Sequence, residues 1–290
     1  MNIAKLLDPK NDYVFKRIFG HSGNEEITKN LLQSIIPDKI DKIELDSNPI
    51  TEKDLLDDKV GILDIKARLN GGNVNCDIEM QVVDQKDIEK RILFYWSKMY
   101  IQTIEAGEDY EKLKRCIVIL ITDYDLETLM KIPEYTTKWK IREEKYPKLV
   151  LTNVLELYII SLNKAKNSTE NQQEELYEWL KFINNPEEEL GMGNDEINKA
   201  KKVLEEISQD ERERRLSELR EKYRMDQHAI MLAGYDKGLK AGIEQTEEKI
   251  FKIANNLLTL GMPIEQIVEV TGLTQEKIIK LKMNNNSNNN

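Results

Sequence analysis

The sequence has few of the residues that build common catalytic and metal sites, with two cysteines and two histidines in 290 residues. Cys76 and Cys116 have neither zinc-ligand spacing nor a CxxC pattern, so we interpret them as reduced, buried thiols of a cytosolic protein. His21 and His228 lie far apart in sequence. The chain therefore gives no support for a Ser-His-Asp site or for a zinc site with several histidine ligands.

Long apolar runs are also missing. No window approaches the roughly 20 apolar residues that span a bilayer, and the longest strongly apolar stretch, Cys116 to Thr122, has the length of one strand. The first residues, MNIAKLLDPKNDYVFK, lack the apolar segment of a secretory signal. We therefore expect a cytoplasmic protein without a membrane partner.

A positive charge balance is absent as well, because the formal net charge is -10. Hydrophobic residues make up 40% and charged residues 33% of the chain, which predicts a real core under a highly charged surface. If the protein binds DNA, it must use a local basic surface or metal ions that neutralise an acidic site.

The pattern of apolar residues predicts an α/β core. Helical spacing is present over 11–19 and 25–36, and again over 86–107, whereas residues 60–83 form two apolar-rich runs joined by NGGN, the pattern of an antiparallel hairpin. A continuous apolar run at 116–122 is typical of a strand buried on both faces. Two further strand candidates follow at 135–143 and 155–162.

Beyond Lys164 the sequence becomes helical and densely charged. The run DERERRLSELREKYR favours a solvated helix with i,i+4 ion pairs over a DNA-binding stripe. We predict a core domain with a helical extension over 1–210, a helical C-terminal module over 211–283 and a disordered, asparagine-rich tail over 284–290.

Three residues of the predicted hairpin are candidate catalytic residues: Asp64 in GILDIKARL, and Glu79 and Gln81 in CDIEMQV. Side chains alternate along a strand, so Glu79 and Gln81 share a face with Asp77, and pairing of the two strands can bring Asp64 beside Glu79. Two carboxylates among apolar neighbours repel each other, and a hard divalent cation resolves this conflict. Such a cation can activate water and stabilise charge on a phosphate.

Several blocks in this order resemble one nuclease family: DPKNDYVFKRIFG, LDDKVGILDIKARL, DIEMQ, YWSKMY with EAGEDY, and LGMPIEQIVEVTGL. They resemble the Rpn family of recombination-promoting nucleases, also described as PD-(D/E)XK nuclease family transposases, and the likeness covers most of the chain. The resemblance implies a PD-(D/E)XK restriction-endonuclease-like core, a mixed sheet flanked by helices, followed by a helical C-terminal region. It implies a DNA endonuclease that uses Mg²⁺, with Mn²⁺ as a substitute, and a metal held by Asp64 and Glu79.

Gln81 stands where the superfamily signature has lysine. An amide can hold a water or a phosphate oxygen, but it has no positive charge and is no general base near neutral pH. Lys66, on the Asp64 face, is our candidate for the missing charge. Glu26, on the helix before the hairpin, is a weaker candidate for an additional metal ligand, since a plain exposed helix residue fits it as well.

The segment IEQIVEVTGLTQEKI resembles a helix-turn-helix, with Thr271-Gly272 at the turn and Thr274 as an N-cap. Its charge is close to balanced, so we leave open whether this module contacts DNA or mediates protein–protein contacts, including homo-oligomerisation.

Three classes of function follow from these observations. The first is a metal-dependent endonuclease that promotes recombination, and the second is an inactive nuclease fold that binds DNA or protein, which Gln81 favours. The third is a transposase that performs strand transfer as well as cleavage.

Overall fold

The computed structural model describes residues 5–46, 65–84, 87–168, 174–188 and 194–287. The chain divides into two compact units, Met1–Tyr223 and Arg224–Asn290. In the described residues, no helix is long and apolar enough to cross a membrane.

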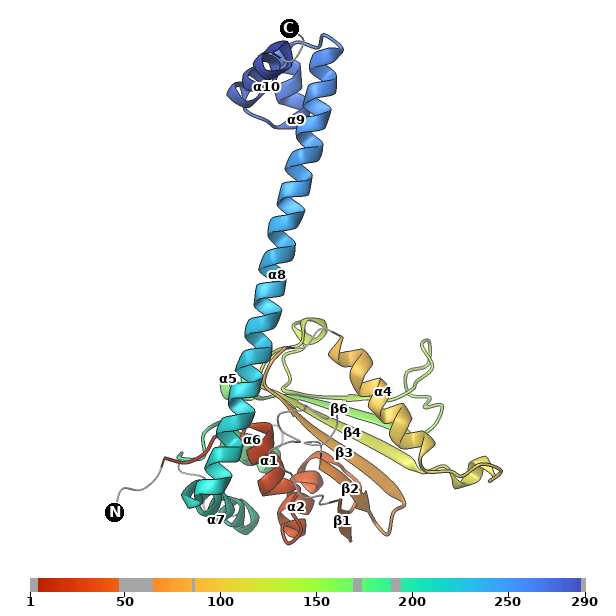
Figure 1. The fold of residues 1–290 in the computed structure, drawn as a ribbon. Helices are drawn as coiled ribbons and strands as arrows, with labels where there is room; N and C mark the ends of the chain where they lie inside the picture. The colour runs from red at the N-terminus through yellow and green to blue at the C-terminus, as the bar shows by residue number, and fades with distance from the viewer. Residues whose placement is uncertain (1–4, 47–64, 85–86, 169–173, 189–193, 288–290) are drawn as a thin grey trace. The chain divides into compact units, whose positions relative to one another are not determined.

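A six-stranded mixed sheet forms the centre of the first unit (Figure 1). Its strands are β1 (Ile43–Leu45), β2 (Ile65–Leu69), β3 (Val74–Gln81), β4 (Arg115–Thr122), β5 (Thr136–Trp139) and β6 (Leu155–Ser161). They are ordered β1-β2-β3-β4-β6-β5. The pairs β3–β4 and β4–β6 are parallel, and the outer pairs are antiparallel.

Helices cover both faces of this sheet (Figure 1). One face packs on α1 (Asp12–Phe19), α2 (Glu25–Ile35), α5 (Leu162–Asn167), α6 (Glu174–Asn184) and α7 (Asp195–Gln209). The other face packs on α4 (Ile88–Ile101), whose Ile88 and Ile92 are buried against apolar side chains of β4 and β6. The first unit also contains two short 3₁₀ helices, η1 (Tyr110–Lys112) and η2 (Glu127–Leu129).

The hydrophobic core on the α1 and α2 side of the sheet is the larger core of this unit, and both helices help to enclose it. Apolar residues repeat at helical spacing in α1 and α2, so each presents one apolar stripe to the sheet. Phe19 contacts Trp179 of α6 edge to face, with ring centroids 5.5 Å apart. Gly20 then allows the end of α1 to approach β2, because a Cβ there would lie 3.1 Å from Cγ1 of Ile65.

The first turns of α8 (Glu211–Thr259) belong to the first unit. Arg220 forms a 2.8 Å ion pair with Asp12, and Arg17 forms one of 2.8 Å with Glu213. The phenol of Tyr13 also donates a hydrogen bond to Glu213, at 2.8 Å. These contacts hold the start of α8 against α1, and the two compact units divide inside α8, between residues 223 and 224.

The second unit is helical. The end of α8, α9 (Ile264–Thr271) and α10 (Gln275–Ser287) enclose a small core around Ala254, Ile267 and Ile278. Gly272 ends α9 at φ 70°, and its N–H donates to the carbonyl of Val268 at 2.9 Å. This left-handed C-cap is the turn predicted at Thr271-Gly272.

The sequence predicts most of these elements. The hairpin of 60–83 is confirmed for its described part, β2 and β3, and β4 is buried from Cys116 onwards, as its apolar run indicates. β1 has no counterpart among the predicted strands, and the helix predicted over 86–107 ends at Ile101. α10 continues to Ser287, into the stretch predicted as a tail, and residues 288–290 lie outside the description.

Candidate active site

The β2–β3 hairpin positions the candidate residues. Lys66 is the cross-strand partner of Asp77, and Ile65 is the partner of Ile78. Partners across a ladder project to the same face, so Lys66 and Asp77 share one face of the sheet. Ile65 and Ile78 share the other face and are part of the larger core.

Alternation along β3 places Glu79 and Gln81 on the Lys66 face together with Asp77. The exposed fraction is 3% for Asp77 and 1% for Glu79, whereas Gln81 is half-buried. Two carboxylate side chains two residues apart are thus buried on one face of one strand. Burial of charged groups is costly, so carboxylates in such positions are typically paired or bound to a cation.

The strand neighbours of Glu79 and Asp77 on β4 are apolar. The partner of Glu79 is Leu120, and the partner of Asp77 is Val118, both of which are buried in the core under α4. The indole of Trp96 on α4 donates a hydrogen bond to the carbonyl of Cys116 at 3.1 Å, which fixes the helix over this face. An electrostatic interaction is stronger in such a water-poor layer than in bulk water.

The carboxyl ends of β3 and β4 are tied to the N-terminal block. The N–H of Asp123 donates to the carbonyl of Gln81 at 2.9 Å. The carboxylate of Asp123 pairs with Lys10 at 2.7 Å and with Lys166 at 3.4 Å. Residues of the motif DPKNDYVFKRIFG therefore lie beside the strand end that carries Gln81.

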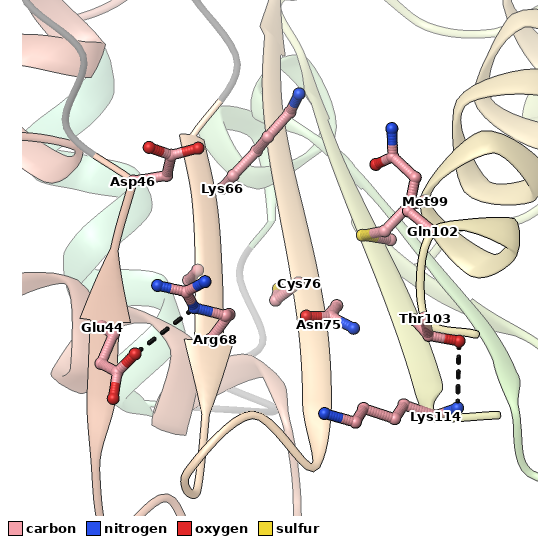
Figure 2. Close-up of a pocket in the computed structure, with 11 residues that line it drawn as sticks. Glu44, Asp46, Lys66, Arg68, Asn75, Cys76, Met99, Gln102, Thr103 and Lys114 are labelled. Carbon is pink, nitrogen blue, oxygen red and sulfur yellow. Dashed lines mark hydrogen bonds and ion pairs between the residues drawn. The ribbon is translucent and has the colours of Figure 1, made fainter. Parts of the chain in front are cut away.

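An open pocket of about 360 Å³ lies over β2 and β3 and includes Lys66, the strand partner of Asp77, in its lining (Figure 2). Lys66 and Arg68 of β2 line it, and Lys114 lines it from the loop before β4. Arg68 pairs with Glu44 at 3.3 Å, and Asp46 is a second acid in the wall. Figure 2 also shows Asn75, Gln102 and Thr103 around the pocket, so donors and acceptors accompany the cations.

The remaining sequence candidates do not join this group in the described structure. Asp64 lies outside the described residues. Glu26 is on α2, with a side chain 68% exposed, and pairs with Lys29 at 3.3 Å. Because α2 packs on the opposite face of the sheet from Glu79, Glu26 has the surroundings of an ordinary helix surface residue.

The donor atoms on this face determine which metal ion it fits. Among the described residues, no group of three or more His, Cys, Asp and Glu side chains lies close enough to hold a metal. The face nevertheless offers carboxylate oxygens of Asp77 and Glu79 and the amide oxygen of Gln81. Hard Mg²⁺ prefers oxygen ligands and needs one or two carboxylates besides water and phosphate, so this donor set fits Mg²⁺.

Two features were missed by sequence reasoning. Asp77 lies on the face that strand alternation predicts, but no motif marks it, and its burial depends on the central position of β3 between β2 and β4. The ion pair between Lys10 and Asp123 joins residues far apart in sequence, and no local pattern indicates such a contact.

The mixed sheet with helices on both faces and acidic residues on a central hairpin is consistent with the PD-(D/E)XK, restriction-endonuclease-like class. The family model described as PD-(D/E)XK nuclease family transposase matches residues 9–233, and the chain belongs to this family. A second model, described as the C-terminal HTH domain of the Rpn/YhgA-like nuclease family, matches residues 247–283. The predicted family is therefore confirmed. No curated protein and no solved structure matches the chain.

Proposed function

We propose that this protein is a metal-dependent DNA endonuclease that hydrolyses phosphodiester bonds at the Lys66–Asp77–Glu79–Gln81 face of the hairpin. The observation that carries the proposal is the burial of Glu79 beside Asp77 on that face, in a chain of a nuclease family. The helix-turn-helix family match at 247–283 supports DNA as the substrate.

Glu79 and Asp64 are the proposed metal ligands, with Asp77 as a neighbouring acid. Asp64 immediately precedes Ile65, and the cross-strand partner of Ile65, Ile78, immediately precedes Glu79. When bound, Mg²⁺ or Mn²⁺ supplies Lewis-acid polarisation of the phosphate and a lowered pKa for a coordinated water. In the overall reaction, water oxygen bonds to phosphorus and one P–O ester bond breaks, giving a phosphate monoester and an alcohol.

Two residues, Gln81 and Lys66, share the roles that the lysine of the PD-(D/E)XK signature has. The amide of Gln81 orients a water or a phosphate oxygen by hydrogen bonding and removes no proton. The ammonium of Lys66, on an exposed position of the same face, stabilises negative charge on the phosphate. The two roles predict different defects: Lys66→Ala reduces the rate through lost charge, whereas Gln81→Ala disturbs positioning.

The cations of the adjacent pocket guide the substrate backbone. Lys66, Arg68 and Lys114 line a pocket next to the proposed reacting face, while the whole chain carries a net charge of -10. Since phosphate contacts supply most of the affinity for DNA, a local cation group is what an acidic chain needs. The acids Glu44 and Asp46 also line the pocket, and Glu44 pairs with Arg68 at 3.3 Å.

The experiment is cleavage of supercoiled plasmid by the wild type, Asp64→Ala and Glu79→Gln, with Mg²⁺ or Mn²⁺ and with EDTA. Glu111→Gln, which changes an exposed acid on η1, is the matched control. We expect metal-dependent nicking or linearisation by the wild type and the control and none by the two site variants. Equal cleavage by all four proteins contradicts the proposed site.

The departure at Gln81 favours one second function, a nuclease fold that binds DNA without cutting it. Its signature is wild-type DNA binding without cleavage under every metal condition. The family description also names transposases; strand transfer requires joined products in addition to nicks, and the same plasmid assay detects them.

A further inference from the structure

The middle of α8, residues 225–249, lies in the second unit and is not covered by any other described element of that unit. Every residue from Met225 to Lys249 is exposed, over roughly 37 Å at 1.5 Å per residue. The same helix enters the small C-terminal core only beyond this stretch, at Ala254. A helix that ran alone through water would be expected to be polar all round.

In this stretch, large apolar side chains occupy four of the seven a and d positions of a heptad pattern. Positions a are Met225, Leu232, Leu239 and Thr246, and positions d are His228, Tyr235 and Gly242. Leu232 is 48%, Tyr235 63% and Leu239 52% exposed. Alternating spacings of three and four place these residues on one stripe, which is the seam of a coiled coil. Ile230, at position f, is an exception.

We propose that this stripe is the interface with a second copy of the same chain, in a parallel two-stranded coiled coil over residues 225–246. The proposal is independent of nuclease activity.

The charge distribution favours a second copy over a different protein. Between residues 225 and 246, Asp236 is the one charged residue at an e or g position, and Asp226, Lys237, Lys240 and Glu244 lie at b or f. Charges at e and g select partners and cause repulsion when they are alike. This seam has almost none, so identical helices meet without a like-charge conflict.

The apolar surface is large enough for a dimer. Six large side chains near the seam are each about half exposed: Met225, Met231, Leu232, Tyr235, Leu239 and Ile243. At roughly 200 Å² per large side chain, they present about 600 Å² in each copy. Two copies that cover all of this surface bury at most about 1,200 Å², which is at the lower limit for stable protein interfaces.

Close approach of the two helices is possible at the C-terminal end of the stripe. A Cβ built at Gly238 or Gly242 meets nothing within 4 Å, so a facing helix has room at positions g and d. A parallel arrangement also suits the module that follows, because helix-turn-helix proteins commonly bind two half-sites as symmetric dimers.

The test is the mass of the full-length protein by sedimentation equilibrium. We expect a dimer for the wild type and for the outer-face control Lys237→Glu. The double variant Leu232→Lys/Leu239→Lys, whose altered residues are already exposed in one chain, is expected to keep its helical circular dichroism and weaken dimerisation at least about a hundredfold. A monomeric wild type, or a double variant that dimerises as tightly, overturns the proposal.

Cysteine cross-linking tests the parallel register. Cys76 and Cys116 are buried, so a new surface thiol reports on its own neighbours. Tyr235→Cys, at position d, should form a disulfide between copies, because facing d residues come within disulfide distance, whereas Lys237→Cys, at f, should not. Equal cross-linking of both variants, or none at Tyr235→Cys in a dimer, contradicts the parallel seam.

Discussion

Glu156 on β6 should stabilise the first unit strongly, and the effect should depend on pH. Its side chain is 1% exposed. The carboxylate pairs with Lys140 at 2.7 Å, Arg115 at 2.8 Å and Lys138 at 2.9 Å, and it accepts a hydrogen bond from the phenol of Tyr158 at 3.0 Å. Glu156→Gln keeps the shape of the side chain but removes its charge from among three cations.

The magnitude follows from the pKa of this carboxyl. Burial acts to raise the pKa of Glu156, but hydrogen bonds from Lys140, Lys138 and Arg115 outweigh burial and lower it to about 2. An unfolded glutamate has a pKa near 4.3, and one pKa unit corresponds to about 1.4 kcal/mol. The ionised network therefore contributes about 3 kcal/mol to the free energy of unfolding at pH 7.

The sign of the pH dependence is fixed by the lowered pKa. A carboxyl with a lower pKa in the folded state stabilises the fold above its unfolded pKa, and the contribution is lost as pH falls from about 4.3 to about 2. The difference in unfolding free energy between wild type and Glu156→Gln should thus be about 3 kcal/mol at pH 7 and roughly half as large at pH 3.

Urea unfolding followed by tryptophan fluorescence measures this difference in the first unit alone. All three tryptophans, Trp96, Trp139 and Trp179, lie in that unit. Glu144→Gln, which changes an exposed residue, serves as the control and should alter the free energy by less than about 0.5 kcal/mol. A Glu156→Gln effect below 1 kcal/mol at pH 7, or one that is equally large at pH 3, refutes the reasoning.

Three further substitutions test other parts of the account. Gly20→Ala places a methyl group 3.1 Å from Cγ1 of Ile65 and should cost about 1–2 kcal/mol in the same urea assay; an unchanged midpoint would show that α1 need not approach β2 closely. Lys114→Gln should weaken DNA binding, measured by fluorescence anisotropy, and reduce the salt slope by about one, whereas Lys112→Gln, outside the pocket, should change neither. Gly272→Ala forces a side chain into φ 70° and should cost the second unit about 1 kcal/mol in thermal circular dichroism; no loss would argue against the left-handed cap.

The local elements of the fold are largely encoded in short-range patterns. The NGGN turn and its flanking apolar runs predict β2 and β3, because Asn70, Gly71 and Gly72 all adopt positive φ there. The apolar run at 116–122 predicts a fully buried β4 for the same local reason. β1 has three residues and too little periodicity to be recognised, and it depends on pairing with β2.

The candidate site depends more on contacts that are distant in sequence. Alternation alone places Glu79, Gln81 and Asp77 on one face, but the burial of Glu79 follows only from the position of β3 between β2 and β4. Glu26 is the opposite case, in which a sequence pattern suggests a role that depends on distant contacts. The family pattern suggests Glu26 as a metal ligand, but its helix, α2, packs on the face of the sheet opposite Glu79.

The most direct test of the proposed nuclease is single-turnover cleavage of a duplex over a range of Mg²⁺ concentrations, comparing the wild type with Glu79→Gln and Glu111→Gln. The account predicts cleavage that rises to saturation with Mg²⁺ for the wild type and Glu111→Gln, and a rate at least about a hundredfold lower for Glu79→Gln at every concentration. A Glu79→Gln protein that cleaves like the wild type, with the same Mg²⁺ dependence, would contradict the assignment of Glu79 as a metal ligand.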